Sequence, residues 1–136
     1  MQGFALEGMT SGAKKSIFWL VGYPVVGTSG FGGTLNQIQY TMPTAGTITK
    51  AWINAVTSPT GAALIFDINI NGTSIWKFHQ ANRIQLKASD ADGKANQTAF
   101  DTTAFVAGDV ITLDCDQIGS TVAGAGITIQ LDYELA

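Results

Sequence analysis

The chain has 136 residues, a formal net charge of −3 at pH 7 and only 12% charged residues, about half the share found in an ordinary soluble domain. This length indicates a single domain with a sizeable core, and the few scattered lysines and arginines exclude the basic surface of a nucleic-acid-binding protein. The shortage of charge predicts that the strands are buried on both faces or that other subunits cover part of the surface, because large exposed apolar patches usually mark interfaces.

Residues 1–35 differ in composition from the rest of the chain. Two lysines precede a mostly apolar run at 16–26, and a glycine-rich stretch follows at 27–33. Pro24 interrupts the run, which is also shorter than the about 20 residues that span a bilayer, so we expect neither a signal peptide nor a membrane segment. We predict an N-terminal arm and glycine-rich linker over 1–35, followed by a β-sandwich domain over 36–136.

The apolar run contains the residues that we expect to anchor this arm. Aromatic and large aliphatic side chains dominate the energetics of interfaces. The run supplies five of them: Ile17, Phe18, Trp19, Leu20 and Tyr23. They would contact a neighbouring chain or the protein's own domain. The pattern of 16–21 fits the first strand of the core equally well, and an arm that adds a strand satisfies both interpretations.

From residue 36 onward, strand patterns alternate with turn residues. Strands are expected at 38–42, 47–56, 62–70, 73–78, 82–88, 97–105, 110–117 and 127–135. Their spacing of about ten residues, the turns between them and the absence of a helical pattern predict an all-β fold. We expect an antiparallel, jelly-roll-like β-sandwich of about eight strands with an extended N-terminal arm. In 47–56 apolar residues occupy both faces, which predicts a strand covered on both sides.

Asn71 and Gly72 give the strongest hairpin signal. A two-residue type I′ turn needs positive φ at both central positions, and these residues tolerate it best. The turn predicts three opposed pairs: Ile70 with Thr73, Ile68 with Ile75, and Phe66 with Lys77. It also makes its two strands neighbours in one sheet, whereas several consecutive jelly-roll strands cross between sheets, so a departure from the standard strand order stays open.

No group of residues indicates catalysis, a metal ion or a cofactor. His79 is the only histidine, and nothing places a nucleophile beside it. Cys115 cannot form an intrachain disulfide and occupies an inward position typical of a small buried hydrophobe. Asp114 and Asp116 share one strand face about 6 to 7 Å apart, as a glycosidase pair or a cation site would require, but outward acids are ordinary on a solvated strand. We therefore expect no enzyme.

Three stretches of the chain resemble a known group of proteins. They are Ser58–Trp76, Ala107–Ser120 and Gly124–Leu131. Together they resemble a β-sandwich module of tailed-bacteriophage virion proteins, found on head decoration or cement proteins and on fibre, tail and baseplate proteins. The resemblance covers about 46–135 and leaves 1–35 outside it. It implies a structural protein of the virion and supplies no catalytic residues.

The resemblance, the short domain and the low charge together predict a capsid decoration, or cement, protein. Such a protein would be assembled in the host cytoplasm, bind the exterior of the capsid over joints of the major capsid protein, and stabilise the head as a homotrimer. The alternative is a tail or fibre module that recognises host-surface glycan through Trp52 and Trp76, although at least one of these tryptophans is more typical of a core. Neither hypothesis involves nucleic acid or a membrane.

Overall fold

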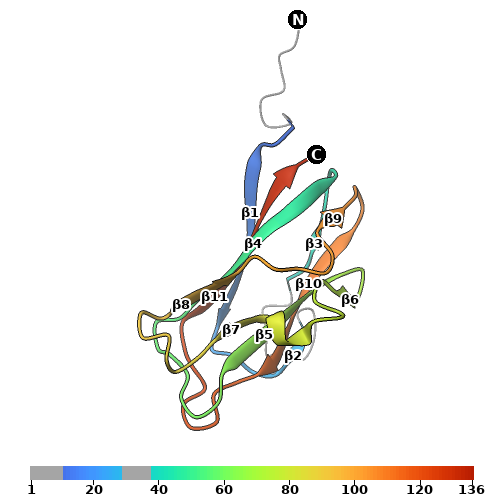
Figure 1. The fold of residues 1–136 in the computed structure, drawn as a ribbon. Coiled ribbons are helices and arrows are strands. Elements are labelled where there is room, and N and C mark those ends of the chain that lie inside the picture. The colour runs from blue at the N-terminus through green and yellow to red at the C-terminus, as the bar shows by residue number, and fades with distance from the viewer. Residues whose placement is uncertain (1–10, 29–37) are drawn as a thin grey trace, which may run out of the picture.

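The computed structural model describes residues 11–28 and 38–136, which form two packed antiparallel sheets (Figure 1). Sheet A contains, in spatial order, β1 (Lys14–Gly22), β11 (Ile127–Leu135), β4 (Gly46–Asn54) and β8 (Lys94–Gln97), with β9 (Ala104–Phe105) also paired to β4. Sheet B contains β2 (Gly27–Thr28), β10 (Val110–Gln117), β5 (Leu64–Ile70) and β6 (Thr73–Ser74), with β3 (Tyr40–Thr41) paired to β10 and β7 (Ile84–Leu86) paired to β5. A 3₁₀ turn, η2, covers Gln80–Asn82. Within residues 11–28 and 38–136, no helix has the length and apolar character needed to cross a membrane.

The short strands combine in pairs along the edges of the sheets. β8 and β9 pair with successive parts of β4, β2 and β3 with successive parts of β10, and β6 and β7 with successive parts of β5. If each pair of short strands is counted as one strand, the sandwich has eight strands, numbered along the chain. Sheet A then has the order first, eighth, third, sixth, and sheet B the order second, seventh, fourth, fifth. This is the arrangement of a jelly roll. It confirms the predicted fold class, and the fourth and fifth strands share a sheet, so the Asn71-Gly72 hairpin fits the standard order.

The hairpin has the predicted turn but a shorter second strand. Asn71 and Gly72 have φ values of 50° and 84°, and Ile70 faces Thr73 as expected. After β6 the chain leaves the strand conformation. Ile75 and Trp76 are both fully buried, whereas a continuing strand would send these consecutive side chains to opposite faces. Phe66 therefore faces Ile84 of β7, and the predicted pairing of Phe66 with Lys77 is wrong.

A β-bulge in β4 explains its irregular pattern. Between β4 and β11 the register shifts by one residue at Thr49, as in a bulge that places two residues opposite one. Ile48 is buried before the bulge and Ala51 after it, so the inward positions change phase. The apolar residues on both faces reflect this change, since Thr49 and Val56 are exposed. The predicted covering of both sides of 47–56 is wrong.

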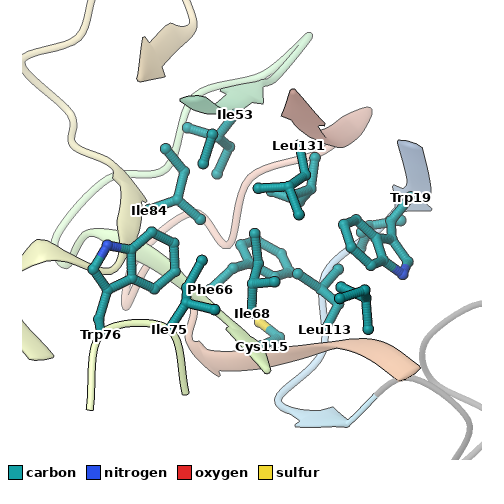
Figure 2. Close-up of a cluster of buried hydrophobic side chains, with 14 of the residues drawn as sticks. Trp19, Ile53, Phe66, Ile68, Ile75, Trp76, Ile84, Leu113, Cys115 and Leu131 are labelled. Atoms are coloured by element: carbon teal, nitrogen blue, oxygen red, sulfur yellow. The ribbon is translucent and has the colours of Figure 1, made fainter. Parts of the chain in front are cut away.

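The core fills the space between the sheets (Figure 2). Alternate residues of β5 and β10 point into it from sheet B, and alternate residues of β4 and β11 from sheet A. Trp19 and Trp76 lie at opposite ends of the labelled cluster, with Phe66 and Ile68 between them. Each large side chain buried here contributes about 1.5 to 3 kcal/mol relative to an exposed one.

The segment 75–83, which we call the strap, connects β6 to β7 and is held by the loop at 98–103. The Trp76 indole donates a hydrogen bond to the Ala99 carbonyl at 2.7 Å, and the Asp101 carboxylate accepts from the backbone N–H groups of Phe78 and His79 at 2.9 and 3.0 Å. These contacts explain why the single strand predicted at 97–105 is wrong, because the backbone N–H groups of Asp101 and Thr102 donate to the Ile75 carbonyl of the strap and not to β4.

β1 and β2 lie within the segment predicted as the N-terminal arm. β1 pairs with β11 along Lys14 to Gly22, so 16–21 forms a strand of the sandwich. The other parts of the predicted arm and linker, 1–10 and 29–35, lie outside the described residues.

Candidate interface on the first strand

Exposed apolar side chains gather on β1 and the residues that follow it. Eight large hydrophobic side chains are exposed among the described residues, and four of them lie within nine residues of sequence. These four form what we call the β1 patch: Phe18 (46% exposed), Leu20 (66%), Tyr23 (66%) and Val26 (56%). A concentration of exposed apolar surface is typical of an interaction site.

The position of β1 at the edge of sheet A makes this patch accessible (Figure 1). Strand alternation sends Trp19 and Val21 into the core and Phe18 and Leu20 to the outward face. Phe18 and Leu20 lie opposite the polar residues Gln130 and Thr128 of β11. The outward face of sheet A is therefore apolar at its β1 edge and polar on the neighbouring strand.

The backbone edge of β1 is partly occupied. The Tyr40 hydroxyl donates a hydrogen bond to the Phe18 carbonyl, and the Trp19 indole N–H donates to the Ile38 carbonyl at 3.0 Å. An unprotected edge strand invites pairing with another strand. Since residues near β3 bond to the middle of this edge, the β1 patch offers its side chains more readily than its backbone.

The five residues predicted as interface anchors divide into two groups. Phe18, Leu20 and Tyr23 are exposed. Trp19 is only 1% exposed, and its ring packs edge to face with Tyr40 at 5.4 Å between centroids. Ile17 is partly buried and packs against the core. The structure corrects the assignment of Trp19 to an interface, because the Trp19 side chain lies on the inward face of β1 and points between the sheets.

The two tryptophans predicted for a glycan surface also differ. Trp76 is fully buried and stacks on Phe100 at 5.7 Å, so its assignment to a surface is wrong; the turn after β6 sends it into the core. Trp52 is half-buried on the outward face of sheet A. Its indole N–H donates to Asp132 at 3.0 Å, and the Lys50 ammonium lies 4.2 Å from its ring centroid. This cation covers the ring face that a sugar would use.

Asp132 is the centre of a polar network on the outward face of sheet A. Burial alone would raise its pKa, but hydrogen bonds from neighbouring side chains outweigh this effect and hold the pKa of Asp132 below its ordinary value. The donors are Gln130 at 2.7 Å, Ser16 at 2.7 Å and Trp52 at 3.0 Å. This carboxylate is satisfied within the chain.

The remaining titratable candidates have structural partners. His79 Nδ1 lies 2.6 Å from Asp101, and Arg83 binds Asp116 at 2.8 Å. Burial raises the pKa of the Cys115 thiol to about 12, which suppresses the reactive thiolate. Within residues 11–28 and 38–136, no three His, Cys, Asp or Glu side chains gather in a way that would hold a metal ion.

Two features of the interface had no specific signal in the sequence. Val26 ends the apolar run at 16–26 but belongs to no alternating pattern, so only its hydrophobicity pointed to it. The contact between Tyr40 and Phe18 joins segments 22 residues apart, and it depends on how the two sheets meet at the β1 edge. Side-chain type alone cannot predict such a meeting.

No protein-family model matches this chain. No curated protein matches it in sequence either.

Similar folds occur in solved phage capsid structures. The chain aligns with a chain of the cyanophage Pam1 capsid asymmetric unit over 100% of its own length and 90% of that chain, with a TM-score of 0.52 and 11% identity. For the acidic stable capsid structure of Helicobacter pylori bacteriophage KHP30 the coverages are 93% and 90%, the TM-score 0.53 and the identity 9%. The capsid of Ralstonia phage GP4 gives coverages of 92% and 84%, a TM-score of 0.49 and 15% identity. At these identities the two alignments with TM-scores above 0.5 establish the fold alone.

Proposed function

We propose that this chain is a structural protein of a phage virion that decorates the capsid and binds the assembled lattice through the β1 patch. The observation that carries the proposal is the extent of the two alignments with TM-scores above 0.5, each of which covers 90% of the matched chain. The matched chains are therefore about as long as this one, so a small stand-alone sandwich is a component of both of those capsid structures.

The composition and the β1 patch support the same function. A chain with 12% charged residues has little means of keeping an exposed apolar strand face soluble unless that face is covered. Each patch side chain that becomes fully buried against a partner contributes about 1.5 to 3 kcal/mol before the costs of association. Phe18 and Leu20 present such surface on a rigid strand, which limits the entropy lost on binding.

The proposed role is mechanical. A protein that binds the assembled lattice more tightly than its separated subunits stabilises the assembly by mass action, by about 2.7 kcal/mol per site at 100 times the dissociation constant. The proposal includes a homotrimer seated on the capsid exterior over joints of the major capsid protein. Sedimentation of the purified chain and labelling of intact virions measure these two features.

The decisive experiment is binding to purified capsids that lack this protein, taken from the phage that encodes it. Replacing Phe18 and Leu20 by Ser should weaken binding at least tenfold, which corresponds to 1.4 kcal/mol. The matched control replaces Val56 and Val106, which are 88% and 59% exposed and lie outside the patch, and should bind as the unchanged protein does. Equal binding by both variants would refute the β1 patch, and labelling confined to the tail would refute decoration.

A further inference from the structure

Two carboxyl side chains lie directly opposite each other on the outward face of sheet B. Asp67 of β5 and Asp114 of β10 are register partners, and directly opposed residues have Cβ atoms about 4.5 to 5.5 Å apart. Their neighbours Phe66 and Cys115 point into the core, so both carboxyl groups are on the opposite face. Like charges in this arrangement repel each other.

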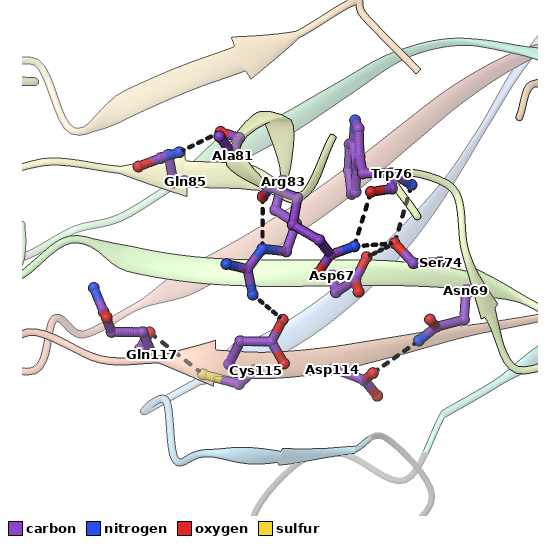
Figure 3. Close-up of polar contacts among 12 residues, drawn as sticks. Asp67, Asn69, Ser74, Trp76, Ala81, Arg83, Gln85, Asp114, Cys115 and Gln117 are labelled. Carbon is purple, nitrogen blue, oxygen red and sulfur yellow. Dashed lines mark hydrogen bonds and ion pairs between the residues drawn. The ribbon is translucent and has the colours of Figure 1, made fainter. Parts of the chain in front are cut away.

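Water has little access to Asp67 and to one oxygen of Asp114. Asp67 is only 6% exposed, because the strap and β6 cover it (Figure 3). The Ser74 hydroxyl donates to Asp67 Oδ1 at 2.6 Å, and Gln80 donates to the Ser74 oxygen at 3.2 Å. Arg83, at the end of the strap, reaches Asp116 of β10 at 2.8 Å. The strap is thus fastened across the strand that carries Asp67.

One oxygen of the pair lacks a donor. Asp114 Oδ2 accepts a hydrogen bond from Asn69 at 2.9 Å, whereas Asp114 Oδ1 is buried and has no hydrogen-bond partner. A buried acceptor without a donor costs about 1 to 3 kcal/mol, and more when it is charged. Arg83 of the strap donates to Asp116 and to the Gln80 carbonyl, so its donors on Nε and one terminal nitrogen are committed.

We propose that Asp67 and Asp114 share one proton in the folded protein, with the Asp67 hydroxyl donating to the unpartnered Oδ1 of Asp114. The proton is taken up from solvent when the chain folds and is released when it unfolds. It removes the repulsion, satisfies the orphaned oxygen and leaves Asp67 Oδ1 free to accept from Ser74. The inference concerns folding alone and does not depend on the proposed function.

The electrostatic surroundings agree with this arrangement. The charged groups that act on Asp67 among the described residues are Asp116 and Asp114 on β10, and Arg83 on the strap pairs with Asp116. Burial, together with the negative charges of Asp116 and Asp114, raises the pKa of Asp67, and the hydrogen bonds from Ser74 and from the Ile68 backbone only partly oppose this. A raised pKa in the folded state means that the stabilisation is complete below the unfolded pKa and is lost as pH rises through the folded pKa.

The test compares the unchanged protein with Asp67→Asn. In this variant the amide N–H₂ can donate to Asp114 Oδ1 and the amide oxygen can accept from Ser74, so the variant reproduces the protonated pair at every pH. Urea unfolding followed by circular dichroism between pH 4 and 9 should give similar folding constants at pH 4. As the pH rises from the ordinary aspartate range toward the raised folded pKa of Asp67, the constant of the unchanged protein should fall relative to that of the variant, by up to tenfold per pH unit, and above that pKa the two curves should run parallel. Curves that run parallel over the whole pH range would overturn the proposal.

Asp132→Asn is the matched control, because Asp132 also lies on the outward face of a central strand but accepts three hydrogen bonds. This variant should be less stable than the unchanged protein at neutral pH, and the difference should shrink as the pH falls, since the pKa of Asp132 is lowered in the folded state. If the stability of Asp132→Asn depended on pH in the same way as that of Asp67→Asn, the effect would come from the loss of any one negative charge, and the shared proton would be contradicted.

Two measurements keep the proposal testable if Asp67→Asn does not fold. Carbon-13 NMR of the aspartate carboxyl groups in the unchanged chain should show Asp67 titrating above the ordinary aspartate range. Titration of Asp67 at the ordinary value would overturn it. Adding Ca²⁺ at pH 8 should leave the stability unchanged; stabilisation that requires Asp67 would mean that a cation, and not a proton, occupies the pair.

Discussion

β1 and β11 are neighbouring strands of nine residues each in one sheet, yet their outward faces differ. Both strands send apolar side chains into the core. Outward, β11 presents Thr128, Gln130 and Asp132, whereas β1 presents Leu20, Phe18 and Ser16 opposite them, so that two of the three β1 residues are apolar. β11 is paired on both sides and β1 on one. The strand with the less protected backbone thus also carries the more apolar outward face.

The difference between the two outward faces indicates which of them is suited to an interface. The sandwich fold requires only that the inward positions be apolar, and β11 shows that the outward positions of this sheet function well with polar residues. Phe18 and Leu20 are therefore not explained by the fold, since they contribute little to the core. An apolar edge face next to a polar, internally satisfied one favours an interface at β1, as the proposed function requires.

The largest expected effect is a loss of stability that distinguishes the inward face of β1 from its outward face. Trp19→Ala should lower the free energy of unfolding by about 3 to 5 kcal/mol, because it removes a fully buried aromatic ring and its hydrogen bond to Ile38. Leu20→Ala should change it by about 0.5 kcal/mol or less, since that side chain is 66% exposed. Urea unfolding followed by circular dichroism measures both. Similar losses would show that the outward face also supports the fold.

A smaller loss of stability is expected at the unpaired edge of β1; β11 has no such edge, because it is paired on both sides. Tyr40→Phe removes the hydroxyl that donates to the Phe18 carbonyl and should cost about 0.5 to 1.5 kcal/mol. Hydrogen exchange of the β1 amides should quicken relative to those of β11. Tyr23→Phe, at an exposed tyrosine, is the control and should change neither quantity. Unchanged exchange in Tyr40→Phe would show that the hydroxyl does not protect the edge.

The smallest effect concerns the one ion pair that links the two strands. Lys14 and Glu134 are 3.2 Å apart, and their side chains are 82% and 39% exposed. Exposed pairs contribute about 0 to 1 kcal/mol, so Lys14→Ala should shift the free energy of unfolding by about 0.5 kcal/mol or less. The shift should vanish in high salt, because screening removes the attraction. A larger, salt-independent loss would mean that the lysine stem packs against β11.

The fold was predictable where one periodicity governs a whole strand. β10 and β11 have the bounds expected from alternation alone, because every second residue is buried along most of each strand. The turn at Asn71 and Gly72 was predictable because two residue types suit positive φ. The strand expected at 73–78 failed because burial of Ile75 and Trp76 outweighed local β propensity, and tertiary packing of this kind has no short-range signal.

The candidate site was predictable in location and only partly in detail. Hydrophobicity alone pointed to a candidate interface within 16–26, but whether Trp19 or Phe18 faces solvent depends on which side of β1 meets sheet B. The pairing of Asp67 with Asp114 required knowledge that β5 and β10 are neighbours. The sequence drew attention instead to Asp114 and Asp116, which share a strand, because spacing along one strand is the only distance that a sequence states.

The bulge at Thr49 has a consequence for how this sequence can change in length. Without Thr49, β4 would alternate regularly from Ile48 through Lys50, Ala51 and Trp52, and every inward side chain would keep its place. Loss of one residue from the middle of β11 would instead exchange the two faces of the strand beyond that point. Loss of the single residue at the bulge is therefore expected to be tolerated among descendants of this chain, whereas loss of one residue from the strand beside it is expected to be eliminated.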